Sequence, residues 1–424
     1  MKKNTGIIAR HFSILILIFC LQPLYSQEIV SIEITGLKRT KPHIAHYPLE
    51  KFLGMDGSTL DLNEVEAAVR DTGILEPNKI ELVETDVNTN SGIASGYILR
   101  VDMAEKWTII PFPVLTAFPG SYNLGLFIID SNFLGIRDQA VVGGTFGTPG
   151  WMMMAMYNHT PNRRGMPGWN AGFSFSRGNN VDQDRDQFTH RDYKTDQLRF
   201  SFGMSHGFTD FLSASASVFF NNISLVDNPE TVNPPESGAM ILGISSSVST
   251  RSSYWDGYLL SQRSFSIDYG YGYGIEGPSY HQIGYRAAFD QSIIPGFRLS
   301  VRSGGIRKSS GNFTSAVDPL FEDGPSRAQV NILPNKFTAS DYIGLSAGLE
   351  KHFFRIGWGS LSAIAAWQIV YSQGSISGRQ FSNGPFAEIR FYMSRIAVPG
   401  LGLGMAYNIN SGRFQFGLNM STGI

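Results

Sequence analysis

A strict two-residue alternation between Ser261 and Phe297 constrains this chain more than any other feature. From Phe265 to Ile275 every second side chain is apolar or aromatic, and the residues between them are Ser, Asp or Gly. Because successive side chains of a strand point to opposite faces, such a segment has one apolar face and one small or charged face. The pattern is typical of a strand that contacts two different environments.

The same alternation recurs down the chain in segments of six to nine residues, which fit within membrane-crossing strands of about ten residues. These segments are 198–205, 212–220, 283–290, 297–302, 387–394, 401–407 and 414–420. Beyond the N-terminus no apolar run reaches about 18 residues, which excludes spanning helices. A closed sheet is the other backbone that can cross a bilayer with its polar groups satisfied.

We therefore predict a mainly β fold, with a transmembrane antiparallel β-barrel of about 16 strands over residues 107–424. This count follows from about twenty residues per strand with its connection. An even number of strands places both ends of the barrel on the periplasmic side. The long polar connections 179–195, 227–237 and 374–384 predict external loops.

Composition supports this class of protein. Only 16% of the residues are charged and 46 are Gly, whereas a soluble protein is nearer a quarter charged. The net charge of -1 gives no reason to expect a nucleic-acid partner, because such binders usually carry a basic excess.

The N-terminus predicts export. Lys2, Lys3 and Arg10 precede an apolar stretch at 14–21, and Ser26 is a small residue at the expected cleavage position. We predict a signal peptide over residues 1–26. A lipid-modified Cys20 is the alternative, although the preceding Phe19 is bulky for such a site. Cys20 is the single cysteine of the chain, so cleavage leaves a cysteine-free mature protein.

Residues 27–106 follow a different pattern, that of a small α+β domain. Strands are expected over 30–34, 80–87 and 96–103, and helices over 42–52 and 62–70. Asp61 is placed to cap the second helix, with Glu64 three residues later. One interpretation of this domain is a small soluble module with no particular role.

Several short phrases give a more specific interpretation. In the N-terminal domain these short motifs are residues 32–36 followed by Arg39-Thr40, then residues 54–60, and residues 105–107 at the end of the domain. The phrases that follow are Pro111, Pro113, Gly125 and Asn132-Phe133-Leu134-Gly135. In this order they resemble a polypeptide-transport-associated (POTRA) domain followed by the barrel of the BamA/TamA outer-membrane assembly family, within the bacterial surface antigen superfamily.

The resemblance implies a site inside the barrel. In that family a long late loop folds into the lumen, and an arginine from an Arg-Gly motif meets an acidic residue of the wall. The corresponding region here, 311–340, has no Arg-Gly pair. Arg327 is the candidate arginine and Glu350 its candidate wall partner; the alternative is that both side chains face water.

The resemblance also implies a seam between the first and last barrel strands, where a client strand would be templated. The candidate seam residues are Trp107, Ile109, Phe112, Phe414, Phe416, Leu418 and Met420. The family usually ends on an aromatic residue, whereas the last alternating residue here is Met420. This departure leaves the signal for the barrel's own insertion undefined.

The function implied by the resemblance is outer-membrane protein assembly, insertion or translocation, with the N-terminal domain in the periplasm. Its partners would be membrane lipid, unfolded client outer-membrane proteins and periplasmic accessory proteins, and it would need no cofactor. One alternative is a passive pore, and another is a diverged surface structural or adhesive protein. A pore would have an aqueous lumen lined by Arg286, Arg298, Arg302, Asp268 and Glu388.

The residues give no indication of an enzyme. His43, His46 and Glu50 have a spacing that could hold a metal, but Pro42 and Pro48 favour a solvated surface. The glycines of 270–274 alternate with tyrosines on a strand, so they do not form a nucleotide loop. The tyrosines at 269, 271 and 273, together with Trp358 and Trp367, are expected in the aromatic girdle. We expect no enzyme activity, cofactor or metal.

Overall fold

The computed structural model describes residues 28–89, 92–118, 121–148, 150–161, 166–227, 231–256, 259–311, 317–322, 324, 327–334, 336–356, 359–374, 377–393 and 400–421. The expected signal peptide, Cys20 and Trp358 lie outside these residues. The chain divides into an N-terminal unit, up to residue 38 and over 45–105, and a barrel unit of residues 39–44 and 106–424.

The N-terminal unit combines a three-stranded sheet with short helices. Its elements are β1 (Ile29–Thr35), η1 (Tyr47–Phe52), η2 (Gly57–Thr59), α3 (Leu62–Arg70), β2 (Leu75–Thr89) and β3 (Gly92–Glu105). The short helix α2 (Pro42–His46) lies at the boundary in the sequence, with residues 42–44 counted in the barrel unit. The central strand β3 runs parallel to β1 and antiparallel to β2. The order β-α-α-β-β is the predicted one, but the first expected helix is divided into α2 and a 3₁₀ turn that contains Pro48 near its start.

Helix α3 shows how the sequence sets the local structure of this unit. The Asp61 side chain accepts a hydrogen bond from the Asn63 amide at 2.9 Å, as expected for an N-cap. Val65, Ala68 and Val69 are buried at helical spacing.

The His46 and Glu50 side chains, whose spacing could have suited a metal, form an exposed i,i+4 pair with His46 Nδ1 3.6 Å from Glu50. The described part of the chain contains no helix long and apolar enough to cross a membrane.

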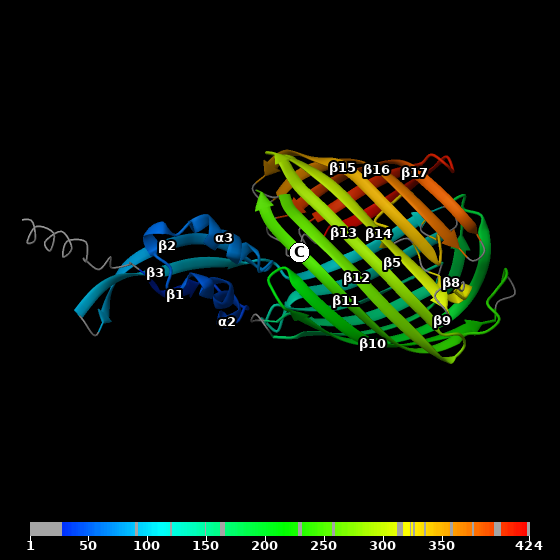
Figure 1. Ribbon diagram of the computed structural model, residues 1–424, viewed down its shortest axis with the longest axis horizontal. Coiled ribbons are helices and arrows are strands. Elements are labelled where there is room, and N and C mark those ends of the chain that lie inside the picture. The colour runs from blue at the N-terminus through cyan, green and yellow to red at the C-terminus, as the bar shows by residue number, and fades with distance from the viewer. Residues whose placement is uncertain are drawn as a thin grey trace, which may run out of the picture. The chain divides into compact units, whose positions relative to one another are not determined.

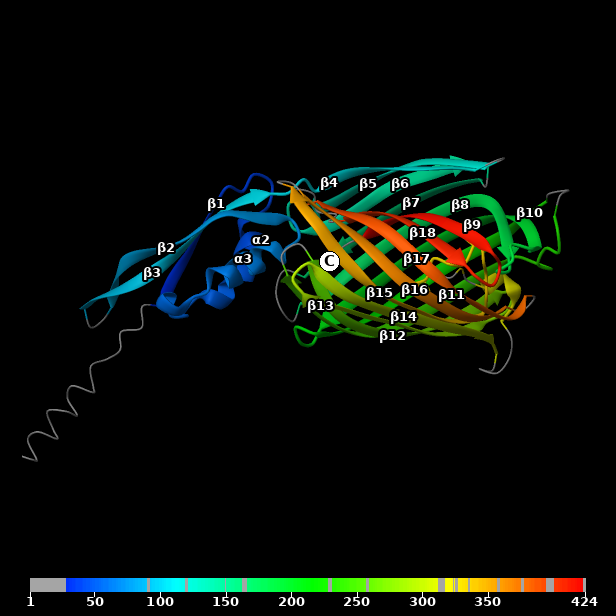
Figure 2. The ribbon, with the colours of Figure 1, turned by 90° about the horizontal axis from the view of Figure 1, so that it is seen from above.

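The barrel unit is a 16-stranded antiparallel sheet rolled into a barrel (Figures 1 and 2). Its strands are β4 (Ile109–Phe118), β5 (Ser121–Phe133), β6 (Asp138–Gly147), β7 (Gly150–His159), β8 (Gly168–Gln183), β9 (Thr189–Gly207), β10 (Leu212–Val226), β11 (Ala239–Asp256), β12 (Leu259–Glu276), β13 (Tyr280–Ile294), β14 (Phe297–Ser310), β15 (Asp341–Ile356), β16 (Gly359–Gly374), β17 (Gly378–Met393), β18 (Gly400–Asn408) and β19 (Arg413–Ser421). Each strand pairs with the next along the chain, and β4 and β19 lie at the two ends of the sheet. The predicted fold class and strand number are confirmed.

The alternation has the predicted orientation. Phe265, Tyr269, Phe414 and Phe416 are 47%, 36%, 56% and 66% exposed, on the outer face. In contrast, Ser266, Asp268 and Gly270 of the same strand β12 border a cavity inside the barrel. A soluble domain would not display rows of exposed aromatic side chains, whereas a barrel surrounded by hydrocarbon requires them.

The external loop expected over 179–195 is mostly strand. β8 continues to Gln183 and β9 begins at Thr189. The polar side chains bind each other across the hairpin: Asn180 donates to Thr195 at 2.6 Å, and Arg191 forms an ion pair with Asp182. The prediction was wrong because polar composition does not prevent strand pairing where the side chains satisfy one another. The connection expected over 374–384 is likewise short, since β17 begins at Gly378.

Candidate functional site in the barrel lumen and at the sheet ends

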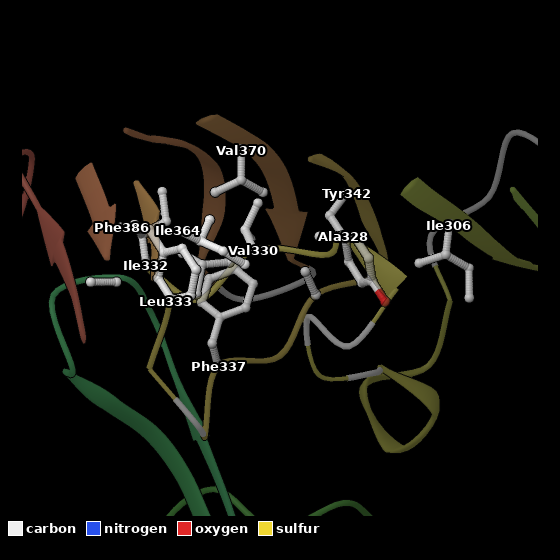
Figure 3. Packing of buried hydrophobic residues seen from close by; sticks show 12 residues of the cluster. Ile306, Ala328, Val330, Ile332, Leu333, Phe337, Tyr342, Ile364, Val370 and Phe386 are labelled. Carbon is white, nitrogen blue, oxygen red and sulfur yellow. The ribbon is translucent and has the colours of Figure 1, made fainter. Parts of the chain in front are cut away.

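The connection between β14 and β15 lies inside the barrel, as the resemblance implied. Its apolar side chains pack on the inner faces of β14–β18, which we call the packed wall (Figure 3). The cluster joins Ala328, Val330, Ile332, Leu333, Phe337 and Ala339 of the connection to Ile306, Tyr342, Ile364, Val370, Phe386 and Ala406 of the strands. This small hydrophobic core within the lumen fixes the connection on one side.

The first part of the same connection contacts the opposite side of the lumen. Val317 and Phe321 pack against apolar residues of β10 and β11, including Ile241. Lys308 Nζ of β14 donates a hydrogen bond to the Phe321 carbonyl at 2.9 Å. The connection therefore lies across the lumen, between two walls.

Glycines of the packed wall let the connection lie directly on the strands. Gly304 of β14 and Gly344 of β15 are paired partners in neighbouring strands. A Cβ at Gly304 would overlap the carbonyl of Arg327, and one at Gly344 would overlap the carbonyl of Ala328. Sequence reasoning missed this contact surface; the signal was the presence of glycine at lumen-facing positions of adjacent strands.

The predicted pairing of Arg327 with Glu350 is wrong. Arg327 instead forms an ion pair with Asp268 on β12. The main chain of Arg327 lies against Gly304, and its guanidinium passes close to Gly284 of β13. From this position the side chain reaches across β13 to Asp268, which is the direct partner of Gly284 in the ladder. Both predicted residues lie in the lumen, but each has another partner.

Glu350 is occupied by a network within the packed wall. It is fully buried and accepts hydrogen bonds from Arg298, Ser362 at 2.5 Å and Tyr392 at 2.9 Å. Arg390 continues the network by donating to the Tyr392 hydroxyl at 3.2 Å. The partners come from β14, β16 and β17, so one carboxylate joins several strands through charge-assisted hydrogen bonds.

Two residues expected to line an aqueous lumen are therefore not in contact with one. Arg298 and Glu388 are both buried, Arg298 against Glu350 and Glu388 against Arg390. Arg302 binds Asp290 at 3.1 Å. Of the five residues proposed for a pore, Arg286 and Asp268 border the cavity described next.

A polar cavity of about 610 Å³ lies against the inner faces of β9–β13, which we call the wet wall. Its lining includes serines of four neighbouring strands. On β10 and β11 three pairs of serines face each other, with hydroxyl oxygens 2.8, 2.8 and 2.6 Å apart in Ser213–Ser249, Ser215–Ser247 and Ser217–Ser245. Among the described residues no group of three His, Cys, Asp or Glu side chains is arranged to hold a metal ion.

The two ends of the sheet contain the candidate seam residues. No ladder joins β4 to β19 in the described part of the chain. Trp107 and Ile109 are exposed, as are Phe414 and Phe416 of β19, whereas Phe112 is half-buried on the other face of β4. Leu418 and Met420 belong to β19, but their side chains lie outside the described residues.

A second polar cluster lies at the end of β5, within the barrel unit. Here two of the short motifs that carry the family resemblance are in contact. Arg39 forms an ion pair with Asp130, and Asn132 Nδ2 donates to the Thr40 hydroxyl at 2.8 Å. The Lys41 amide donates to the Gly135 carbonyl at 2.9 Å. Gly135 has a φ of 74°, and a Cβ there would overlap the Arg39 carbonyl. The phrases Arg39-Thr40 and 132–135 therefore form one contact.

Comparison with solved structures supports the architecture. CdiB from Escherichia coli matches with a TM-score of 0.61 and 10% identity, over 94% of this chain and 75% of that one. CdiB from Acinetobacter baumannii matches with a TM-score of 0.60 and 12% identity, over 93% and 74%. A crystal structure of BamA from Haemophilus ducreyi lacking POTRA domains 1–3 matches at 0.48 and 12%, over 92% and 83%, a score too low to bear on the fold. At these identities the likeness to CdiB establishes the fold alone. No protein-family model and no curated protein sequence matches the chain.

Proposed function

We propose that this chain is an outer-membrane assembly or insertion protein of the BamA/TamA type. In this proposal the signal peptide of residues 1–26 is removed and the barrel of residues 107–424 resides in the bacterial outer membrane. Residues 27–106 form a POTRA-like domain in the periplasm. The short phrases that resemble this family support the proposal, and the CdiB-like fold is compatible with it.

The observation that carries the proposal is a sheet whose terminal strands, β4 and β19, share no ladder among the described residues. A strand edge exposes unpaired N–H and C=O groups, which are costly within a bilayer. An unfolded client outer-membrane protein can satisfy these groups by adding a strand at the seam. Folding of the client supplies the driving force, and no cofactor is required.

The interior of the barrel favours this lateral route over passage through the lumen. The connection between β14 and β15 packs on the packed wall and also on β10 and β11. A polypeptide crossing the lumen would have to displace two apolar clusters and the ion pair of Arg327 with Asp268. We therefore propose insertion at the seam, with membrane lipid and unfolded clients as partners and periplasmic accessory proteins as further ones.

Insertion kinetics test the proposal. Purified protein is reconstituted in liposomes, an unfolded client barrel is added, and the rate of its insertion is measured against protein-free liposomes. We expect faster insertion with the protein present. Equal rates in both preparations would contradict the proposal.

A passive pore is the second candidate, favoured by the polar cavity along the wet wall. Planar-bilayer recording separates the two candidates. A pore predicts a steady conductance in every inserted molecule and no effect on client insertion. An assembly protein with an occupied lumen predicts low or intermittent conductance together with faster insertion.

A further inference from the structure

The tip of the β8–β9 hairpin contacts strands at the far end of the sheet. The Arg185 amide donates to Gln380 Oε1 at 3.0 Å, and its guanidinium donates to the Phe381 carbonyl at 2.7 Å, both on β17. Arg413, the first residue of β19, donates to Gln187 Oε1. The hairpin therefore binds two of the last three strands, one of which is a terminal strand of the sheet.

The tip itself is a well-defined turn. Asp184 Oδ1 accepts hydrogen bonds from the amides of Asp186 and Phe188, each at 2.9 Å. The Gln187 amide donates to the Asp184 carbonyl at 3.1 Å, and Gln187 has a φ of 63°. This local network presents the Gln187 side chain and the Arg185 main chain in a fixed geometry.

The base of the tip is anchored to the connection inside the lumen. The Gln183 amide donates to the Lys336 carbonyl at 2.9 Å, and the Thr338 amide donates to the Gln183 carbonyl at 3.4 Å. Phe337, between these two partners, is buried in the cluster on the packed wall. The hairpin thus rests on a fixed support at one end and binds β17 and β19 at the other.

Among the described strands, β19 pairs with β18 alone, through nine residue pairs. A terminal strand with one neighbour is the part of a sheet that opens most readily. A hydrogen bond from Arg413 to Gln187 therefore restrains the strand whose movement the proposed function requires.

We propose that residues 183–189 form a latch that restrains opening of the seam between β4 and β19. The inference rests on the proposed function for its biological meaning, but the restraint on β19 can be measured separately. Displacing the latch shifts the population of the barrel toward the open seam. Insertion of a client is then limited by latch release.

Distance measurements test the restraint itself. Cysteines replacing Leu124 of β5 and Phe416 of β19, both exposed on the outer face, carry spin labels in the otherwise cysteine-free mature chain. We expect Arg185→Ala with Gln187→Ala to lengthen or broaden the distribution of distances between the labels. Phe188→Ala is the matched control, because Phe188 lies in the same turn and its ring contact is with His190. Identical distributions for the double variant and the parent protein would overturn the latch.

The rate of client insertion tests the role of the latch. We expect the double variant Arg185→Ala, Gln187→Ala to speed insertion several-fold and Phe188→Ala to leave the rate unchanged. A reducible bis-maleimide crosslink between Gln187→Cys and Arg413→Cys holds the latch closed; because it lowers the population with an open seam, we expect it to slow insertion by about tenfold. Reduction should restore the rate, and each single cysteine variant controls for its own substitution. An unaltered rate with the crosslink formed would overturn this role.

The two experiments separate the latch from the proposed function. If the parent protein does not speed insertion but the double variant alters the label distances, the latch holds and the proposed function fails. If the parent protein speeds insertion but neither the distances nor the rate responds to the latch variants, the proposed function holds and the latch fails.

Discussion

The wet wall and the packed wall differ in what covers their inner faces. On the wet wall, serine hydroxyls bind each other across β10 and β11 and face the polar cavity. On the packed wall, the connection between β14 and β15 and the network around Glu350 bury the inner face. Both walls have rows of apolar side chains on their outer faces, but their inner faces differ.

This contrast between the two walls predicts which strands of the barrel can move. The packed wall joins β14–β18 through apolar contacts and buried ion pairs, so these strands are expected to move as one body. Strand β19, next to this body, is held by its ladder with β18 and by Arg413. We therefore expect β19 to move more readily than the strands of the packed wall beside it.

Removing the charge of Glu350 is expected to have the largest effect on stability. Glu350→Gln leaves Arg298 buried without its carboxylate, which costs about 3–5 kcal/mol for a broken buried pair. Urea unfolding of the refolded barrel in lipid vesicles, followed by tryptophan fluorescence, measures the loss. A cost no larger than that of a wet-wall serine substitution would show that the packed wall is not specially stabilised.

Removing Arg327 is expected to have the next largest effect. Arg327→Ala leaves Asp268 without its partner, and a charged hydrogen bond of this kind contributes about 1.5–3 kcal/mol. Arg286→Ala on the wet wall is the control, since no carboxylate lies within ion-pair distance of Arg286 among the described residues; we expect a change within about 0.5 kcal/mol. Urea midpoints of the two variants should separate clearly, and equal midpoints would contradict the assigned ion pair.

Two glycine-to-alanine substitutions, one on each wall, test whether only the packed wall is in close contact with the connection. Gly304→Ala places a Cβ against the Arg327 carbonyl and is expected to cost about 1–3 kcal/mol by overpacking. Gly270→Ala on the wet wall meets no atom closer than 3.8 Å and is expected to be neutral or slightly stabilising. Limited proteolysis of residues 311–340 reports the same difference, since faster cleavage is expected in Gly304→Ala alone. Equal cleavage of both variants would mean that the connection does not depend on this contact.

The smallest effect is expected from the wet-wall serines. Ser215→Ala removes one hydrogen bond to Ser247 at the edge of the cavity, and the remaining hydroxyl can bind water. The expected cost is about 1 kcal/mol or less. Urea unfolding measures it, and a loss comparable to that of Glu350→Gln would place a stabilising network on this wall as well.

Much of the fold could be predicted because one periodicity governs it. The alternation at Phe265 to Ile275 and its repeats predicted the barrel and its outer face, and the length of residues 107–424 predicted the number of strands. The end of a strand was harder to predict, because the polar residues of 179–195 pair with each other across the hairpin instead of forming a loop. The periodicity of a strand indicates which of its faces contacts lipid and which faces the lumen. It does not indicate which side chain each residue binds.

The site was predicted only in part, for a related reason. Arg327 and Glu350 were correctly placed in the lumen, but their partners depend on how the connection lies on Gly304 and Gly344. That contact joins segments far apart in the sequence, and the alternation of a single strand contains no information about it. The contacts of Gln187 with Arg413 and of Arg185 with β17 were not anticipated for the same reason.

Photocrosslinking of a client during insertion determines whether clients enter between β4 and β19. A photoreactive phenylalanine analogue replaces Ile109 of β4, Phe416 of β19 or, as control, Phe265 of β12, which is exposed on the same outer face. If clients enter at the seam, an unfolded barrel should crosslink strongly at Ile109 and Phe416 and weakly at Phe265. Equal crosslinking at all three positions, or none at the two seam positions while insertion proceeds, would contradict entry between β4 and β19.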